Sequence, residues 1–374
     1  MYLLRSCLLA SVLLTLVMGS VLAQNKKFDP NAGYIPVVAP EDKKKSKDDI
    51  TPAQALALPP ELPAAVTAET NRLTFRVTPL SAKGLLSQQT HNALKMLLHS
   101  SHGTIVQLRA FVAGSGDLRR VGEIVGEMFQ EKHLALPALS AVQVGALPLE
   151  GAQVVIEATE VDHKVVNPEG VAFLTAQPAL SVSESLGKLN AVLASAGLQP
   201  ADALSVTCFV SSLDSQHGTQ QAMSAAFPAA ALDYVQMQRG PVEPAASCEA
   251  RARLRTAVSS GVKREAQAAL VSSPEVVITG TQMAFGSQDS DLKLAFERLE
   301  KTLGEKNARI EHAVISHLYV TSGGLIHRVL ALQSAQPGTA HLATVVPVEA
   351  LPSLDAAFGL DVVAVPDSTG TGNQ

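Results

Sequence analysis

The feature that most constrains how this chain can fold is an internal repeat. In three segments, apolar residues first recur at helical spacing and then alternate at strand spacing, and a second helical pattern follows each strand. Val112, Val210 and Val320 mark the same point of the three strands and lie 98 and 110 residues apart. Such spacings are too long for a solenoid repeat. The sequence therefore predicts three copies of one α/β module, which we place at 71–160, 161–256 and 257–366.

Two polar segments flank the predicted modules. Residues 24–70 combine mixed charges with prolines such as Pro30, Pro36 and Pro52, which interrupt helices and strands. Residues 367–374 are polar as well. Such segments bury too little apolar surface to offset the entropy that is lost on ordering, so we expect a disordered linker and a disordered tail.

The first residues indicate the compartment. A positively charged start, Met1 to Arg5, precedes an uncharged apolar run from Leu8 to Leu22, and Val21-Leu22-Ala23 has small residues where a signal peptidase cuts. The run is shorter than the roughly 20 apolar residues that a membrane span needs. We therefore expect a signal peptide at 1–23 and an exported protein, periplasmic or secreted, without a membrane span.

The composition excludes some classes of partner. With 47% hydrophobic and 17% charged residues, the chain has the make-up of a globular protein with a large core. Its formal net charge of −5 argues against binding to nucleic acid, which needs a basic face. His99 and His102 have no third candidate ligand nearby, and no spacing of Cys and His fits a metal site. The sequence indicates neither a metal nor a cofactor.

Several motifs are more specific than the composition. The first module carries Gln89-Thr90 followed by Ala93-Leu94, then Pro137-Ala138-Leu139-Ser140-Ala141-Val142-Gln143-Val144, then Leu147-Pro148. The other two modules repeat parts of this order, with Phe173 to Gln177, Val235 to Met237, Val277 to Gly280 and Leu351-Pro352. This order of motifs resembles the RidA (YjgF) family over about 71–366.

The resemblance implies a fold and an assembly. RidA proteins are homotrimers whose sheets face a central barrel, whose helices lie outside and whose clefts between subunits bind the ligand. Three fused copies imply an α/β (α+β), chorismate-mutase-like fold in which each module has a mixed sheet and two helices. A single chain would then complete the three-fold arrangement by itself, as a pseudo-trimer that is a monomer in solution.

The family's site is incomplete in all three modules. RidA proteins deaminate reactive enamines and imines, and an arginine in their Pro-Ala-Arg segment holds the substrate carboxylate with its planar fork of donors. The equivalent positions here are Leu139, Leu232 and Ala343. From strand alternation we expect three interface faces, all without a basic residue: Leu139, Ala141 and Gln143; Leu232, Tyr234 and Gln236; Ala343, Val345 and Pro347. Val142 and Val144 are then expected to face the core of module one.

Five residues remain as candidates for ligand binding. The acidic residue on the family's last strand corresponds to Val155, Glu249 and Asp361 in the three modules. Near the first turn, Gln177 has a counterpart in Gln282, although Thr281 fits that position equally well. With Tyr234 from the second interface face, the candidates are Gln177, Tyr234, Glu249, Gln282 and Asp361. The alternatives are ordinary solvated strand positions for the two acids and turn chemistry for the two glutamines. We assign no catalytic residue.

The resemblance also places Cys208 and Cys248 on neighbouring strands. Alternation directs both side chains toward the helices of module two, where they form either a disulfide or two buried free thiols. His317 lies near the start of a strand and is expected to face a different direction from His312. Tyr319 is expected to serve in packing, like Phe209.

Two hypotheses of function follow. The first is a non-catalytic, exported pseudo-trimer that binds a small molecule in a cleft between modules, or an unknown partner protein. The second is a divergent enamine/imine deaminase that uses Glu249, Asp361 or a bound water in place of the arginine. The missing arginine favours the first hypothesis. So does the compartment, because the family's usual substrates arise beside cytoplasmic enzymes and decay quickly in water.

Overall fold

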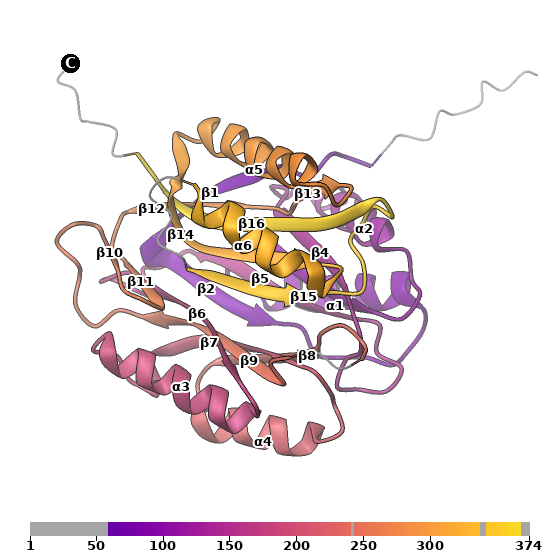
Figure 1. The fold of residues 1–374 in the computed structure, drawn as a ribbon, viewed down its shortest axis with the longest axis horizontal. Coiled ribbons are helices and arrows are strands. Elements are labelled where there is room, and N and C mark those ends of the chain that lie inside the picture. The colour runs from indigo at the N-terminus through magenta and orange to yellow at the C-terminus, as the bar shows by residue number, and fades with distance from the viewer. Residues whose placement is uncertain (1–58, 241–242, 337–341, 368–374) are drawn as a thin grey trace, which may run out of the picture. The chain divides into compact units, whose positions relative to one another are not determined.

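The computed structural model describes residues 59–240, 243–336 and 342–367. The predicted signal peptide, most of the predicted linker and residues 368–374 of the predicted tail lie outside these residues. Within them, no helix is long and apolar enough to cross a membrane. The described part of the chain contains three mixed sheets, and two longer helices belong to each (Figure 1).

The sheet of module one has the strand order β2-β5-β3-β4. Its elements are β2 Leu73–Val77, α1 Leu86–Ser100, β3 Gly103–Ala113, α2 Leu118–Glu131, β4 Ala138–Val144 and β5 Val154–Asp162. β3 and β4 run parallel, and the other neighbouring strands are antiparallel. Helix α2 begins where the Asp117 carboxylate accepts a hydrogen bond from the N–H of Arg119, and its apolar residues recur at spacings of three and four.

Modules two and three repeat this order as β6-β9-β7-β8 and β12-β16-β14-β15. Module two contains β6 Val171–Ala179, α3 Val182–Ser195, η2 Pro200–Asp202, β7 Ala203–Val210, α4 Gln216–Ala226, β8 Ala231–Gln236 and β9 Ala246–Arg253. Module three contains β12 Glu275–Thr279, β13 Gln282–Phe285, α5 Asp289–Gly304, β14 Ala308–Val320, η3 Gly323–Leu325, α6 Ile326–Ser334, β15 Ala343–Pro347 and β16 Ala356–Pro366.

The registers of the strands allow the modules to be compared residue by residue. Leu139, Leu232 and Ala343 occupy the same place beside the central strand of their sheets, on β4, β8 and β15. The predicted equivalence of these three positions is therefore confirmed. The same registers serve below to compare other positions of the three modules.

Two sheets each take a strand from a neighbouring part of the chain. β1 Ala65–Glu69 leads through η1 Thr70–Arg72 into module one, yet it pairs antiparallel with β12 of module three. The hairpin of β10 Val262–Arg264 and β11 Ala268–Val271 joins the sheet of module two, where β11 pairs with β6.

These strands differ from the predicted boundaries. The last residues of the predicted linker, 65–70, are ordered, and 262–271 belong to the sheet of module two rather than to module three. β1 and β11 supply hydrogen-bond partners for the backbone groups at the edges of β12 and β6. The predicted boundaries were drawn from the sequence pattern, which does not show this pairing. At the other end, Asp367 of the predicted tail is also ordered, since its N–H donates to the carbonyl of Asn307 at 2.7 Å.

Apolar residues form one separate core beneath the helices of each module and two clusters shared between modules. The first shared cluster joins all three modules through Phe111, Phe209 and Tyr319, with Val142 and Val144 of β4 beside them. The rings of Phe111 and Phe209 meet edge to face with their centroids 5.9 Å apart. We call the place where the three sheets meet the module junction.

The structure inverts the predicted faces of β4, β8 and β15. Leu139 and Ala141 belong to the separate core of module one, whereas Val142 and Val144 face the module junction. The same inversion places Tyr234 in the core of module two. Alternation distinguishes two faces of a strand, but it cannot tell which is which when both faces are buried and apolar.

Cys208 of β7 and Cys248 of β9 lie opposite each other in the register and form a disulfide, with their Cα atoms 4.1 Å apart. Both residues belong to the separate core of module two, beneath its helices. The expected direction of the two side chains is confirmed. Of the two alternatives left by the sequence, the structure has the disulfide rather than the free thiols.

Candidate functional site

Each module contributes two polar side chains to the module junction at the same level of its sheet. One comes from the central strand, at Arg109, Thr207 and His317, and these are equivalent positions. The other comes from the last strand and lies opposite the first in the register, at Glu157, Glu249 and Asp361. The predicted equivalence of Val155 with Glu249 and Asp361 is wrong by two residues. Val155 lies instead in the first shared apolar cluster.

These side chains form one connected network, which we call the central cluster. Arg109 Nη2 lies 2.5 Å from Glu157 Oε2 and 2.8 Å from Glu249 Oε1. His317 Nε2 lies 3.2 Å from the same Glu249 oxygen, and His317 Nδ1 lies 2.7 Å from Asp361 Oδ1. The network therefore crosses from module one through module two to module three.

Hydroxyl groups complete the central cluster. Ser140 donates to Asp361 Oδ2 at 2.6 Å, Tyr319 donates to the same oxygen at 2.9 Å, and Thr207 donates to Glu157 Oε1 at 2.5 Å. Each residue of the cluster is buried, with an exposed fraction of at most 8%. The eight residues are Arg109, Ser140, Glu157, Thr207, Glu249, His317, Tyr319 and Asp361. The side chain of Arg251 lies at its margin, 3.5 Å from Glu249 Oε1.

Burial opposes every charge in this cluster, but opposite charges outweigh it. Glu157 and Glu249 hold the pKa of Arg109 well above its ordinary value despite burial. Against the same desolvation, His317 and Arg109 hold the pKa of Glu249 well below its ordinary value, and His317 also lowers the pKa of Asp361. Glu249 and Asp361 in turn raise the pKa of His317 although burial alone would lower it. Each nitrogen of His317 lies next to a carboxylate oxygen, so the protonated ring can donate to both Glu249 and Asp361.

Asp233 of β8 behaves differently from the acids of the cluster. It stands at the position equivalent to Ser140, and burial, followed by the neighbouring Glu157 charge, raises its pKa well above the ordinary value. Without a cation of its own, this buried carboxyl is stable in its neutral form.

The side chains of the central cluster are engaged with one another across the three modules. A general base needs a free carboxylate or imidazole within reach of substrate, but Glu249 and Asp361 are bound by cations and buried. The Ser140 hydroxyl donates to Asp361 and not to His317, so the imidazole does not activate it. Among the described residues, no group of three or more His, Cys, Asp or Glu side chains could hold a metal ion.

The five predicted ligand-binding residues do not meet in one cleft. Glu249 and Asp361 lie in the central cluster, and Tyr234 lies in the core of module two. Gln177 is buried and donates to the carbonyl of Thr175 at 2.7 Å, while Gln282 is half-buried on β13. Their registers make Gln177 and Gln282 equivalent, which resolves the choice between Gln282 and Thr281 in favour of Gln282.

Sequence reasoning missed Arg109 and His317 as partners of the two acids. His317 was expected near a strand start, but it lies deep in β14 and faces the module junction. A signal was available, because Arg109 and His317 are separated by the same two repeat distances as Val112 and Val320. A basic residue recurring at one repeat position, opposite an acid, indicates a shared function at that position.

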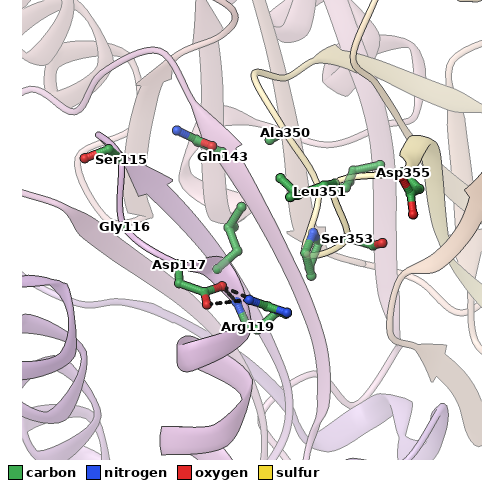
Figure 2. Close-up of a pocket in the computed structure, with 12 residues that line it drawn as sticks. Ser115, Gly116, Asp117, Arg119, Gln143, Ala350, Leu351, Ser353 and Asp355 are labelled. Atoms are coloured by element: carbon green, nitrogen blue, oxygen red, sulfur yellow. Dashed lines mark hydrogen bonds and ion pairs between the residues drawn. The ribbon is translucent and has the colours of Figure 1, made fainter. Parts of the chain in front are cut away.

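A hollow between modules one and three is open to the surface. It has a volume of about 510 Å³ and is lined by the segment 115–119, by Gln143 and by the segment 350–355. Figure 2 shows Asp117 and Arg119 paired with each other on one side of it, and Ser353 and Asp355 on the other. We call this hollow the module one–three cleft.

A second hollow of about 530 Å³ runs beside β2, at the border of modules one and two. Its lining is mostly apolar and consists of residues 75–79, Met96, Leu97, His99, Ser100 and Ala231. We call it the β2 groove. Neither Glu249 nor Asp361 lines the cleft or the groove.

Comparisons with known proteins bear on module one. Residues 64–161 match the family model described as endoribonuclease L-PSP. No curated protein matches the chain. Similar solved structures include Rv2704 from Mycobacterium tuberculosis, a member of the YjgF family, at 22% identity over 24% of this chain and 78% of that one, with a TM-score of 0.23.

Two further solved structures are similar over comparable lengths. NMB1025 from Neisseria meningitidis, a YjgF family member, has 13% identity over 26% of this chain and 83% of that one, with a TM-score of 0.23. TdcF from E. coli, solved with bound serine, has 20% identity over 27% of this chain and 92% of that one, with a TM-score of 0.21. The family match covers residues 64–161, and the similar solved structures include YjgF family members, so module one is similar to the RidA (YjgF) family.

Proposed function

We propose that this protein is an exported, non-catalytic RidA-like pseudo-trimer that binds a small polar molecule in the module one–three cleft. The observation that carries the proposal is the state of the acids. Glu249 and Asp361, the residues available for proton transfer, are buried in the central cluster and neutralised by Arg109 and His317. The alternative of a divergent deaminase requires those two acids to meet a substrate.

The positions of the missing arginine support the same proposal. Leu139, Leu232 and Ala343 carry no charge and pack against the separate cores of their modules. At these three positions a substrate carboxylate would therefore lose its hydration without gaining a charge-assisted pair of hydrogen bonds. Losing such an anchor costs roughly a thousandfold in rate.

The lining of the module one–three cleft suits a neutral or zwitterionic ligand. Its cation, Arg119, is exposed and already paired with Asp117 at 3.0 Å, and Asp355 adds a second acid. Ser115, Gln143 and Ser353 supply hydroxyl and amide groups for hydrogen bonds. An anion is disfavoured there, whereas a polyol or an amino acid such as serine can use both donors and acceptors.

The disulfide supports export, which is part of this proposal. Disulfides persist in oxidising compartments and are rare in the cytosol, so the Cys208–Cys248 bond agrees with the signal peptide predicted at 1–23. Cell fractionation tests this point, with the mature chain expected outside the cytoplasm. Light scattering tests the pseudo-trimer, with a mass near that of one chain expected.

A coupled assay that generates 2-aminoacrylate in the reaction mixture tests the absence of catalysis. We expect the decay of the imine to match that in buffer, while an arginine-bearing RidA protein accelerates it. Acceleration by this chain comparable to that of the family member would falsify the non-catalytic proposal.

Ligand binding is tested by thermal shift with serine and with neutral polyols as probes. We expect at least one probe to stabilise the protein and Ser353→Trp, which fills the cleft, to abolish the shift. Ser212→Trp is the matched control, because Ser212 lines a different hollow within module two. Equal loss in both variants, or no shift with any probe, contradicts the assignment of the cleft.

A further inference from the structure

The first strands of the three modules differ in what covers their outer edges. In module three the outer edge of β12 is paired with β1, and in module two the outer edge of β6 is paired with β11. The register makes Leu73 of β2 equivalent to Val171 of β6, which is one of the residues that β11 covers. Among the described residues, however, β5 is the only strand that pairs with β2.

The chain connection explains why module one lacks the additional strand. β1 comes from the segment before module one, and β11 comes from the segment before module three. The corresponding segment before module two is 163–170, which runs directly from β5 to β6. It reaches only the start of β2, where the N–H groups of Val166 and Asn167 donate to the carbonyl of Asn71 at 3.0 and 2.9 Å.

Two residues of β2 are left with unpaired backbone groups at this edge. The N–H of Thr78 donates to Ile156 on the β5 side, while the carbonyl of Leu73 accepts from Asn167 Nδ2 on the other side at 2.7 Å. Alternation then directs the N–H and C=O groups of Phe75 and Val77 away from β5. No hydrogen bond among the described residues uses these groups. An unpaired edge of this kind is a template for another strand.

The β2 groove lies beside this edge. Residues 75–79 line it together with Met96 and His99 of α1. Met96 is 52% exposed, although a methionine gains from burial. Of the ionisable side chains in the lining, Arg76 is already paired with the buried Glu160 at 3.0 Å, so the apolar residues decide what the groove can bind.

We propose that the β2 groove binds an extended peptide segment of a partner protein, rich in small apolar residues, which adds as an antiparallel strand to the sheet of module one. Backbone groups of Phe75 and Val77 bind its main chain, and the apolar lining receives its alternate side chains. The two strands that cover the equivalent edges show which chemistry fits. β1 is Ala-Val-Thr-Ala-Glu and β11 is Ala-Ala-Leu-Val, so small apolar residues suit the edge.

The test uses a synthetic fluorescent peptide with the sequence of residues 63–70 of this chain as the probe, added to the full mature protein. We expect saturable binding with one peptide per chain. Hydrogen exchange is expected to slow at the amides of Phe75 and Val77 when peptide is bound, because these amides then lie in a ladder. The control is the same peptide with alternate backbone nitrogens methylated, which cannot form the ladder.

Two variants sharpen the test. The N–H of Val77 points away from β5, so Val77→Pro removes a donor to the peptide without breaking a hydrogen bond to β5. Edge strands tolerate proline at such positions. Ala231→Trp fills the groove and leaves β2 unchanged. Each is expected to weaken binding by about tenfold or more. Binding that protects neither amide, or no binding at millimolar peptide, overturns the proposal, and the exchange measurement on the unaltered protein decides it even if a variant fails to fold.

Discussion

The module junction contains two neighbouring layers that follow different rules. In the aromatic layer, the equivalent positions Phe111, Phe209 and Tyr319 carry similar side chains in all three modules. In the polar layer two residues earlier, the equivalent positions carry Arg109, Thr207 and His317, which have different charge and size. Both layers come from the same three strands, so the strand geometry does not account for the difference.

The difference follows from the physics of each layer. Apolar packing is not directional, so one kind of side chain can be used three times around an axis. Three identical cations around an axis would repel each other in a medium of low dielectric constant. A homotrimer must place identical residues there, whereas a fused chain can place an arginine, a threonine and a histidine among three carboxylates. Fusion therefore allows a charged junction in which two cations, Arg109 and His317, are shared among three acids.

The largest expected effect is that of breaking the polar layer at Arg109. Arg109→Ala leaves Glu157 and Glu249 buried without their main cation, so we expect a loss of about 3–5 kcal/mol in the free energy of unfolding. Chemical denaturation measures it. The control is Arg109→Met combined with Glu157→Gln and Glu249→Gln, which removes the charges together and should recover most of the loss. A loss below about 1 kcal/mol in Arg109→Ala would mean that the layer is not energetically important.

The disulfide lies directly behind the polar layer, since Cys208 follows Thr207 and Cys248 precedes Glu249. It closes a loop with a sequence separation of 40. Replacing both cysteines by alanine should lower the free energy of unfolding by about 2–4 kcal/mol, mainly because the unfolded chain gains conformational entropy. The dependence of stability on pH should stay the same, because the disulfide faces the opposite side of the sheet. A changed pH profile would show that the two sides are coupled.

The charges of the polar layer predict how stability depends on pH. The pKa of His317 in the folded protein is raised above its ordinary value of 6.5. Its contribution to the free energy of unfolding is therefore complete below pH 6.5 and is lost as pH rises through the folded pKa. Glu249 and Asp361 have folded pKa values below their ordinary values of 4.5 and 3.8. Their contribution is complete above those values and is lost as pH falls through the folded pKa.

For these three groups, stability should be highest between about pH 4.5 and 6.5, with a decline on the alkaline side of at most about 1.4 kcal/mol per pH unit for each proton released. Denaturation at a series of pH values measures this profile. His317→Gln should reduce the alkaline decline. Asp233 also contributes to it, because its raised pKa makes stability fall as pH rises above 3.8, so His317→Gln combined with Asp233→Asn should flatten the profile further.

The smallest expected effect is that of a conservative change in the aromatic layer. Phe209→Leu keeps the position apolar and nearly fills the same volume, so we expect a loss of about 1 kcal/mol and no change with pH. Thermal and chemical unfolding measure it. A loss as large as that of Arg109→Ala would remove the proposed difference between the two layers.

The candidate site was only partly predictable from the sequence. Glu249 and Asp361 were selected by their place in the last strands, and the structure places both at the module junction. Their role was not predictable, because it depends on Arg109 and His317, which come from other strands and, in part, from other modules. Tyr234 was assigned to the wrong face for the reason given for β4, since apolar residues bury both sides of β8.

The sequence by itself determined the repeat, the order of helices and strands in each module and the equivalence of Leu139, Leu232 and Ala343, because periodicity is a local property of the chain. The tertiary structure decided which face of each strand meets the junction, which cation neutralises which acid and which sheet takes β1 and β11. These are contacts between residues far apart in the sequence. Their energies depend on burial and distance, which no local pattern records.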